Sequence, residues 1–211
     1  LPARFLPDQE KELLERMRAA LTAAAVDFEA VEVPATPRRA MVLVRNIALM
    51  QRETEEVLTG PPAKVAFDAE GKPLPAAEGF ARTQEVDMAD TFLLDTDKGK
   101  YLAVRKKTGG GKTADILSAV CPEIISALPF PKRMRWGTGE FMYARPLRWI
   151  VALLDDAVIP FSVAGVAAGR RTHGHRVHSA GLLEVPAAGD YHRIIRDEGK
   201  IILSAEERRN H

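Results

Sequence analysis

Three histidines close together in the sequence form the most metal-like pattern in this chain. They are His173, His175 and His178. In an extended segment His173 and His175 share one face, whereas His178 points to the other. Zinc needs three or four ligands, the nearest carboxylate is Glu184, and the surrounding arginines repel a cation. We therefore expect no metal site here, and we expect these histidines to have a structural or RNA-facing role.

Two short segments place five cations beside both tryptophans of the chain. They read Pro131-Lys-Arg-Met-Arg-Trp136 and Arg145-Pro-Leu-Arg-Trp149. Arginine and tryptophan together can bind RNA, because the guanidinium pairs with phosphate and the indole stacks on a base. The alternative is that both tryptophans are core residues with arginine stems packed across them. That alternative is favoured for Trp149, which leads an apolar run, and stays open for Trp136.

Positive charge is concentrated in the region that holds these segments. Residues 132–178 contain eight Lys and Arg against three acids, whereas the rest of the chain has 22 against 26. Such clustering is typical of proteins that meet phosphate-bearing partners, although a solvated basic face has the same composition. The candidate contacts for a nucleic acid or another subunit are Lys132, Arg133, Arg135, Arg145, Arg148, Arg170, Arg171, His175 and Arg176.

Other motifs do not support catalysis. Residues 109–113, Gly-Gly-Gly-Lys-Thr, resemble the end of a phosphate-binding loop, but Lys106 occupies the position of its first glycine, so we expect a turn. The chain has a single cysteine, Cys121, which excludes an internal disulfide and a four-cysteine zinc site. A single cysteine fits a reducing cytoplasm. Cys121 lies in an apolar segment, so we expect it to be buried. We expect Asp155-Asp156 to form a turn between two apolar strands, because aspartate is typical of turns. We predict no catalytic residue and no metal or cofactor in this chain.

The elements that must position these residues follow from hydrophobic periodicity. Apolar residues make up 46% of 211, enough for one large or two modest domains, and the longest apolar run is six residues, far short of the ~20 that span a membrane. We predict a loop over 58–75 and a hairpin of 92–94 with 101–104. The remaining predictions are helices at 8–26 (with Asp8 as N-cap), 76–86, 114–128, 190–198 and 201–209, and strands at 28–33, 39–47, 149–154 and 158–166.

Six segments in order resemble one family. They are Ala35-Thr-Pro-Arg-Arg39, Glu78-Gly-Phe-Ala-Arg82, Asp97-Lys-Gly99, Pro131 to Trp136, Arg145 to Trp149 and Gly174-His-Arg-Val-His178. Their order and content are similar to the N-terminal part of the beta subunit of bacterial heterotetrameric glycyl-tRNA synthetase. The resemblance covers nearly the whole chain, to Arg209. The family's beta subunit is longer, so its later tRNA-binding region is expected to lie outside this sequence.

The resemblance implies an α+β fold in which mixed or antiparallel sheets pack with helices, similar to an editing-type domain of the phenylalanyl-tRNA synthetase beta subunit. It implies an N-terminal domain over 1–186, with a division into two subdomains near 60–75 as an alternative. Residues 187–211 would begin a following helical region.

The resemblance also implies a function. The parent enzyme is a class II glycine–tRNA ligase that uses ATP and magnesium, and this chain would belong to its non-catalytic subunit, which handles tRNA and supports assembly. The implied partners are an alpha subunit, in a complex of two alpha and two beta subunits, and the tRNA for glycine, in the cytoplasm without a membrane. Two alternatives stay open. One is a free-standing hydrolase of mischarged aminoacyl-tRNA centred on residues 173–178, and the other is a pure assembly module.

Overall fold

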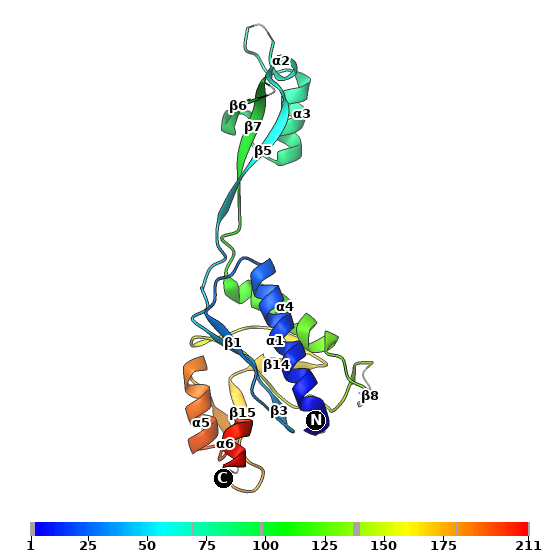
Figure 1. The fold of residues 1–211 in the computed structure, drawn as a ribbon, viewed down its shortest axis with the longest axis vertical. Coiled ribbons are helices and arrows are strands. Elements are labelled where there is room, and N and C mark those ends of the chain that lie inside the picture. The colour runs from blue at the N-terminus through cyan, green and yellow to red at the C-terminus, as the bar shows by residue number, and fades with distance from the viewer. Residues whose placement is uncertain (1–2, 69, 98, 137–139, 180, 211) are drawn as a thin grey trace. The chain divides into compact units, whose positions relative to one another are not determined.

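The chain divides into two compact units. A computed structural model describes residues 3–68, 70–97, 99–136, 140–179 and 181–210. Unit 1 consists of residues 1–51 and 111–211, and unit 2 consists of residues 52–110 (Figure 1). The sequence placed divisions near 60–75 and at 187. Both places lie inside a unit, so the structural division falls elsewhere along the chain.

Unit 1 combines helices with short strands. Its helices are η1 (Ala3–Phe5), α1 (Leu6–Ala23), α4 (Thr113–Ala127), η3 (Ala188–Asp190), α5 (Tyr191–Asp197) and α6 (Ala205–Arg209). Its strands are β1 (Ala30–Glu32), β2 (Ala35–Thr36), β3 (Arg39–Ala40), β4 (Leu43–Arg45), β8 (Met134–Arg135), β9 (Met142–Tyr143), β10 (Ile150–Val151), β11 (Leu153–Leu154), β12 (Ala157–Val158), β13 (Ser162–Val163), β14 (Val166–Gly169), β15 (Arg171–His173) and β16 (Leu182–Glu184).

Helix α1 supplies one side of the core of unit 1. Its buried residues recur at every fourth position, namely Gln9, Leu13, Met17 and Leu21. Three of the four are apolar and join residues of α4 in one hydrophobic cluster. The predicted helix is confirmed, but it runs from Leu6 to Ala23, and the prediction of Asp8 as its N-cap is wrong, because Phe5 is the N-cap. Pro7 occupies the first turn, where its missing N–H is not needed.

The predicted strand at 39–47 is wrong as one continuous element. β3 pairs with β2 across the turn Pro37-Arg38, whereas β4 pairs with β1. The tight turn is held by Thr36 Oγ1, which accepts hydrogen bonds from the backbone N–H groups of Arg38 and Arg39 at 3.3 and 3.1 Å. The two strand partners differ, so the segment changes direction after Ala40.

The predicted strands at 149–154 and 158–166 are likewise divided. Residues 149–154 contribute to β10 and β11, and 158–166 contains the end of β12, all of β13 and the start of β14. Pro160 has no N–H for a ladder and follows β12. Ala164 and Gly165, both with positive φ, form the turn that pairs β13 with β14. The predicted turn at Asp155-Asp156 is confirmed, because β11 pairs with β12 on either side of it.

Unit 2 is a three-stranded antiparallel sheet with helices. Its strands, in the order β5-β7-β6, are β5 (Thr54–Pro62), β6 (Thr91–Thr96) and β7 (Gly99–Thr108), and its helices are α2 (Ala63–Ala66), α3 (Pro75–Gln84) and η2 (Met88–Asp90). The predicted hairpin is confirmed by the register of β6 with β7, in which Leu94 lies opposite Tyr101. The small core contains Ala66, Ala77 and Leu102, packed against Phe80.

The predicted loop over 58–75 is wrong in its first half, which forms the end of β5 and α2. Gly60 suggested a loop, but it is a packing residue. A Cβ there would lie 2.8 Å from the ring of Phe80, so only glycine lets α3 approach the sheet this closely. Gly109 is explained in the same way. Its φ is +103°, and a Cβ would lie too close to the carbonyl oxygen of Arg52.

The fold class is α+β, as predicted. Every described strand pairing is antiparallel except that of β10 with β14, which is parallel, so the sheets are mixed or antiparallel. No helix in the described part of the chain is long and apolar enough to cross a membrane.

Candidate functional site

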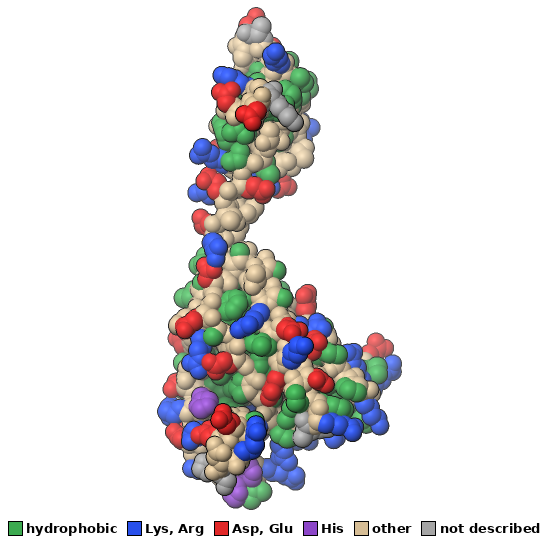
Figure 2. All heavy atoms as spheres, in the orientation of Figure 1, with side chains coloured by type: hydrophobic (Ala, Val, Ile, Leu, Met, Phe, Trp, Pro, Cys, Tyr) green, Lys and Arg blue, Asp and Glu red, His purple; other side chains and the backbone are tan. Residues whose placement is uncertain are grey.

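Four of the predicted contact residues form what we call the basic arm, defined as Lys132, Arg133, Arg135 and Arg145. All four side chains are exposed. β8 carries Arg135 opposite Met142 of β9, and the other three lie just before or after this pair of strands. Figure 2 shows blue Lys and Arg spheres gathered at the end of unit 1 where Figure 1 labels β8. Within the described residues, Lys132, Arg135 and Arg145 have no ion pair and no side-chain hydrogen bond.

Aromatic packing fixes the backbone of the basic arm. The half-buried Trp136 donates its Nε1–H to the carbonyl oxygen of Tyr143 at 3.2 Å. Tyr143 is buried edge-on against Phe130, with ring centroids 4.5 Å apart, and burial raises the pKa of its phenol to about 12. Arg133 donates to the carbonyl oxygen of Leu128 at 2.9 Å. Trp136 therefore uses its polar atom to hold β8 on β9.

A second group of predicted contacts lies around β15. Arg170 is half-buried and donates to two carbonyl oxygens, those of Pro186 and Asp156, each at 3.0 Å. That geometry gives Arg170 an architectural role. Arg171 and Arg176 are exposed. β15 and β8 lie on different sides of unit 1 in Figure 1, so the nine candidates do not share one surface.

The histidines are organised by their own backbone. His175 Nδ1 accepts hydrogen bonds from the backbone N–H groups of Val177 and His178, at 3.2 and 3.3 Å. The rings of His175 and His178 stack with centroids 4.6 Å apart. His173 instead lies edge-on to Trp149, at 4.9 Å. The described residues contain no group of three or more His, Cys, Asp or Glu that could hold a metal ion.

A buried arginine lies behind β15. Arg39 is 8% exposed, and its guanidinium carbon lies 5.5 Å from the ring centroid of Trp149. Its Nε and Nη2 have no hydrogen-bond partner among the described residues. In exposed Arg45, by contrast, the same two atoms donate hydrogen bonds to the carboxylate of Glu32. Burial lowers the pKa of Arg39, nearby Tyr191 opposes that shift, and Arg38 adds to it.

The comparison with known families agrees with this arrangement of sequence segments. The family model described as "Glycyl-tRNA synthetase beta subunit" matches residues 1–211. The chain belongs to this family.

Arg148 is the remaining candidate contact. It follows the basic arm in the sequence, lies one residue before Trp149, and is exposed.

Curated relatives of this chain have names equivalent to the description of the family. A "Glycine--tRNA ligase beta subunit" from Nitratidesulfovibrio vulgaris (strain DSM 19637 / Miyazaki F) is 57% identical over 209 residues, which is 99% of this chain and 30% of the relative. Proteins of the same name from Lawsonia intracellularis and Geotalea daltonii are each 40% identical, over 100% and 95% of this chain and 30% of each relative. The chain thus spans about 30% of the length of these relatives.

The burial of Arg39 and Gln9 was not predicted from the sequence. Arg39 belongs to a segment that carried the resemblance, but its burial depends on Trp149, more than a hundred residues away. Gln9 is 2% exposed on the apolar stripe of α1. A signal for Gln9 was present, since it is the one polar residue at the four-residue spacing of Leu13, Met17 and Leu21.

The single cysteine of this family member is expected to react slowly. Cys121 is half-buried and not fully buried as expected, and this partial burial raises the pKa of its thiol from 9.0 to about 11. The thiolate is the nucleophile, so at pH 8 the reactive fraction falls about 100-fold relative to the unfolded chain. Alkylation by iodoacetamide, followed by mass spectrometry in buffer and in urea, measures both rates. Similar rates in the two conditions would contradict the burial.

The raised pKa of Cys121 also makes stability depend on pH. The neutral thiol stabilises the folded state below pH 9, and this contribution to the free energy of unfolding is lost as the pH rises from 9 to 11.

Proposed function

We propose that this chain is part of the non-catalytic beta subunit of a cytoplasmic glycine–tRNA ligase. The subunit supports ATP-dependent attachment of glycine to its tRNA by handling the tRNA and assembling with an alpha subunit, two of each forming the complex. The class II catalytic centre, with its ATP and magnesium, belongs to the alpha subunit, and this chain holds no cofactor. Family membership and the names of the relatives support this assignment.

The basic arm is the observation that carries the RNA part of the proposal. Among the described residues, Lys132, Arg135 and Arg145 are exposed cations with no carboxylate partner. Neighbouring like charges repel one another, and an anionic partner relieves that repulsion. Phosphates of tRNA supply such charge at regular spacing. We also propose, from the family resemblance, that the fold is similar to an editing-type domain of the phenylalanyl-tRNA synthetase beta subunit.

Removing three of the four cations of the basic arm, and keeping Arg133 because it bonds to Leu128, is expected to weaken tRNA binding without unfolding the protein. The variant is Lys132→Ala with Arg135→Ala and Arg145→Ala in the full-length beta subunit. Each lost phosphate contact reduces the slope of log K against log salt by about 0.7–0.9, so three contacts reduce it by about 2.1–2.7. Fluorescence anisotropy with labelled glycine tRNA over a salt series, in the presence of the alpha subunit, gives the slope.

Arg170→Ala is the matched control. Two carbonyl oxygens lose a charged donor but stay accessible to water, so the free energy of unfolding should fall by about 0.5–1.5 kcal/mol while the salt slope stays unchanged. An unchanged slope in the triple variant would overturn the RNA-binding role of the basic arm. Deacylation of mischarged tRNA by the beta subunit alone would favour the hydrolase alternative instead.

A further inference from the structure

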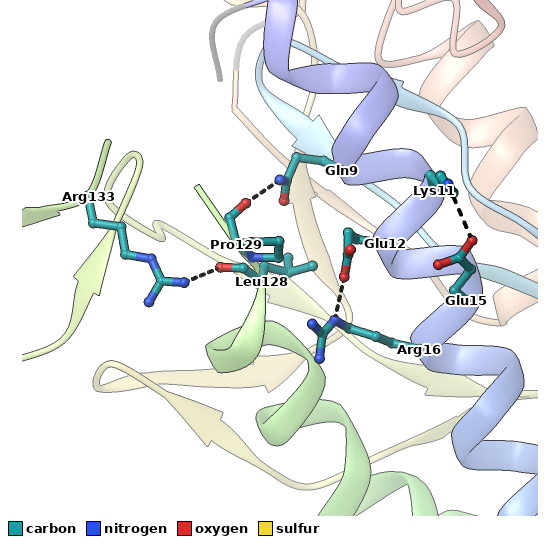
Figure 3. A network of polar contacts seen from close by, with 8 residues as sticks. All are labelled: Gln9, Lys11, Glu12, Glu15, Arg16, Leu128, Pro129 and Arg133. Carbon is teal, nitrogen blue, oxygen red and sulfur yellow. Dashed lines mark hydrogen bonds and ion pairs between the residues drawn. The ribbon is translucent and has the colours of Figure 1, made fainter. Parts of the chain in front are cut away.

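A groove lies between α1 and the segment that follows α4. It has a volume of about 470 Å³, and its lining includes Phe5, Phe130 and a row of polar residues from α1. Figure 3 shows this region, with Gln9 of α1 pointing to Pro129, and with Lys11 and Glu15 on the other side of the helix. The mechanism proposed above assigns no role to this groove.

The floor of the groove carries an unsatisfied acceptor. Gln9 is 2% exposed and lines the groove. Its Nε2–H donates to the carbonyl oxygen of Pro129 at 2.5 Å, but its buried Oε1 has no hydrogen-bond partner among the described residues. Buried polar atoms in native proteins are nearly always paired. A donor from outside this chain would satisfy Gln9 Oε1.

The rim of the groove is acidic. Asp8, Glu12 and Glu15 line it with one cation, Lys11. Glu12 is paired with Arg16 at 2.9 Å and Glu15 with Lys11 at 3.9 Å, as the dashed lines in Figure 3 mark. Asp8 is exposed and has no ion pair among the described residues. Asp8 is therefore the rim carboxylate that is left to attract a cation.

The walls favour a long cationic side chain over a small ion. Phe5, Pro129, Phe130 and Pro131 supply apolar surface beside the acids. Lysine and arginine bury their methylene stems on apolar surface while the charged head stays among polar groups. Their N–H groups are also the donors that an unpaired amide oxygen requires. The ion pairs Lys11–Glu15 and Arg16–Glu12 within α1 neutralise two of the three rim acids when the groove is empty. The surface can therefore exist in the free subunit as well as in a complex.

We propose that this groove docks a lysine- or arginine-bearing segment of the alpha subunit. The inference rests on the proposed function, which supplies that polypeptide partner. The cationic head lies near Asp8 and Gln9, and its stem packs against Phe5 and Phe130. Because Pro131 lines the groove and Lys132 of the basic arm follows it, this places the subunit contact beside the surface proposed for RNA.

Charge variants of the rim test the docking surface in the full-length beta subunit. Asp8→Asn with Glu15→Gln should weaken binding of the alpha subunit about 10-fold, and Asp8→Lys with Glu15→Lys about 100-fold or more. Calorimetric titration with purified alpha subunit measures the dissociation constant, and circular dichroism checks that each variant folds. The matched control is Glu78→Lys with Glu123→Lys, two exposed helix acids outside the groove, which should leave the affinity unchanged.

Photo-crosslinking identifies the occupant. Benzoylphenylalanine in place of Lys11, at the rim, should crosslink to an alpha-subunit peptide that contains Lys or Arg. Crosslinks to tRNA, to the beta subunit's own remaining residues or to a second beta subunit would overturn the proposal, as would unchanged affinity in both rim variants. Failure of the wild-type beta subunit to bind the alpha subunit at all would instead refute the proposed function.

Discussion

Replacement of Leu102 by alanine is expected to unfold unit 2 while unit 1 stays folded. Leu102 is fully buried at the centre of β7, and the core around it is small. A leucine-to-alanine change in a core costs about 2–5 kcal/mol. A unit of about 60 residues has a total stability of only about 3–9 kcal/mol. The loss is therefore a large fraction of what holds this sheet together.

Two measurements separate the units. Both tryptophans, Trp136 and Trp149, belong to unit 1, so their fluorescence reports only its unfolding. Hydrogen exchange of peptides from β5 and β7 reports unit 2. Leu102→Ala should remove protection from those strands and leave the tryptophan transition unchanged. Leu93→Ala is the matched control, because Leu93 lies directly opposite Leu102 but is 50% exposed. Persistent protection of β7 in Leu102→Ala would contradict the prediction.

Replacement of Arg39 by methionine is expected to stabilise unit 1. Arg39 is buried, and its Nε and Nη2 lack partners among the described residues, which include every acid of the chain. An unpaired buried charge is costly, whereas methionine retains the long stem that packs on Trp149. Replacing a buried ion pair by packed apolar groups ranges from neutral to a stabilisation of about 1–4 kcal/mol. We expect a gain of that order for the isolated chain.

Urea unfolding followed by tryptophan fluorescence measures the effect. Arg45→Met is the matched control, because exposed Arg45 has both donors on Glu32, and its loss should leave the transition unchanged or slightly lower. A strongly destabilised Arg39→Met would show that the guanidinium finds a partner in solution. If the full complex loses tRNA charging while the chain gains stability, Arg39 is retained for function at a cost in stability.

The sequence predicted the long, regular elements well. α1 and α4 carry apolar residues at helical spacing, and the hairpin of β6 with β7 follows from alternation around a turn. These signals are local, so periodicity reveals them. The short strands were predicted poorly. The segment after Arg39 has the composition of one strand, but it pairs with two different partners, and pairing partners are set by distant segments.

Glycine and proline misled the prediction of residues 58–75 for a related reason. Gly60 is required by the ring of Phe80 on another element, not by a turn. Glycine occurs in loops where the local backbone conformation requires it. It also occurs in strands where a side chain from another element packs too closely for a Cβ atom. Only the packed structure distinguishes the two.

The sequence by itself determined the α+β class, the family and the concentration of positive charge between residues 132 and 178. Tertiary structure alone decided which of those charges are available. It ties Arg170 to carbonyl oxygens, leaves the cations of the basic arm exposed, and buries Arg39 against Trp149. Charge and periodicity are properties of residues in order along the chain. Burial and pairing depend on which distant segments pack together, because a side chain loses water only where another element covers it.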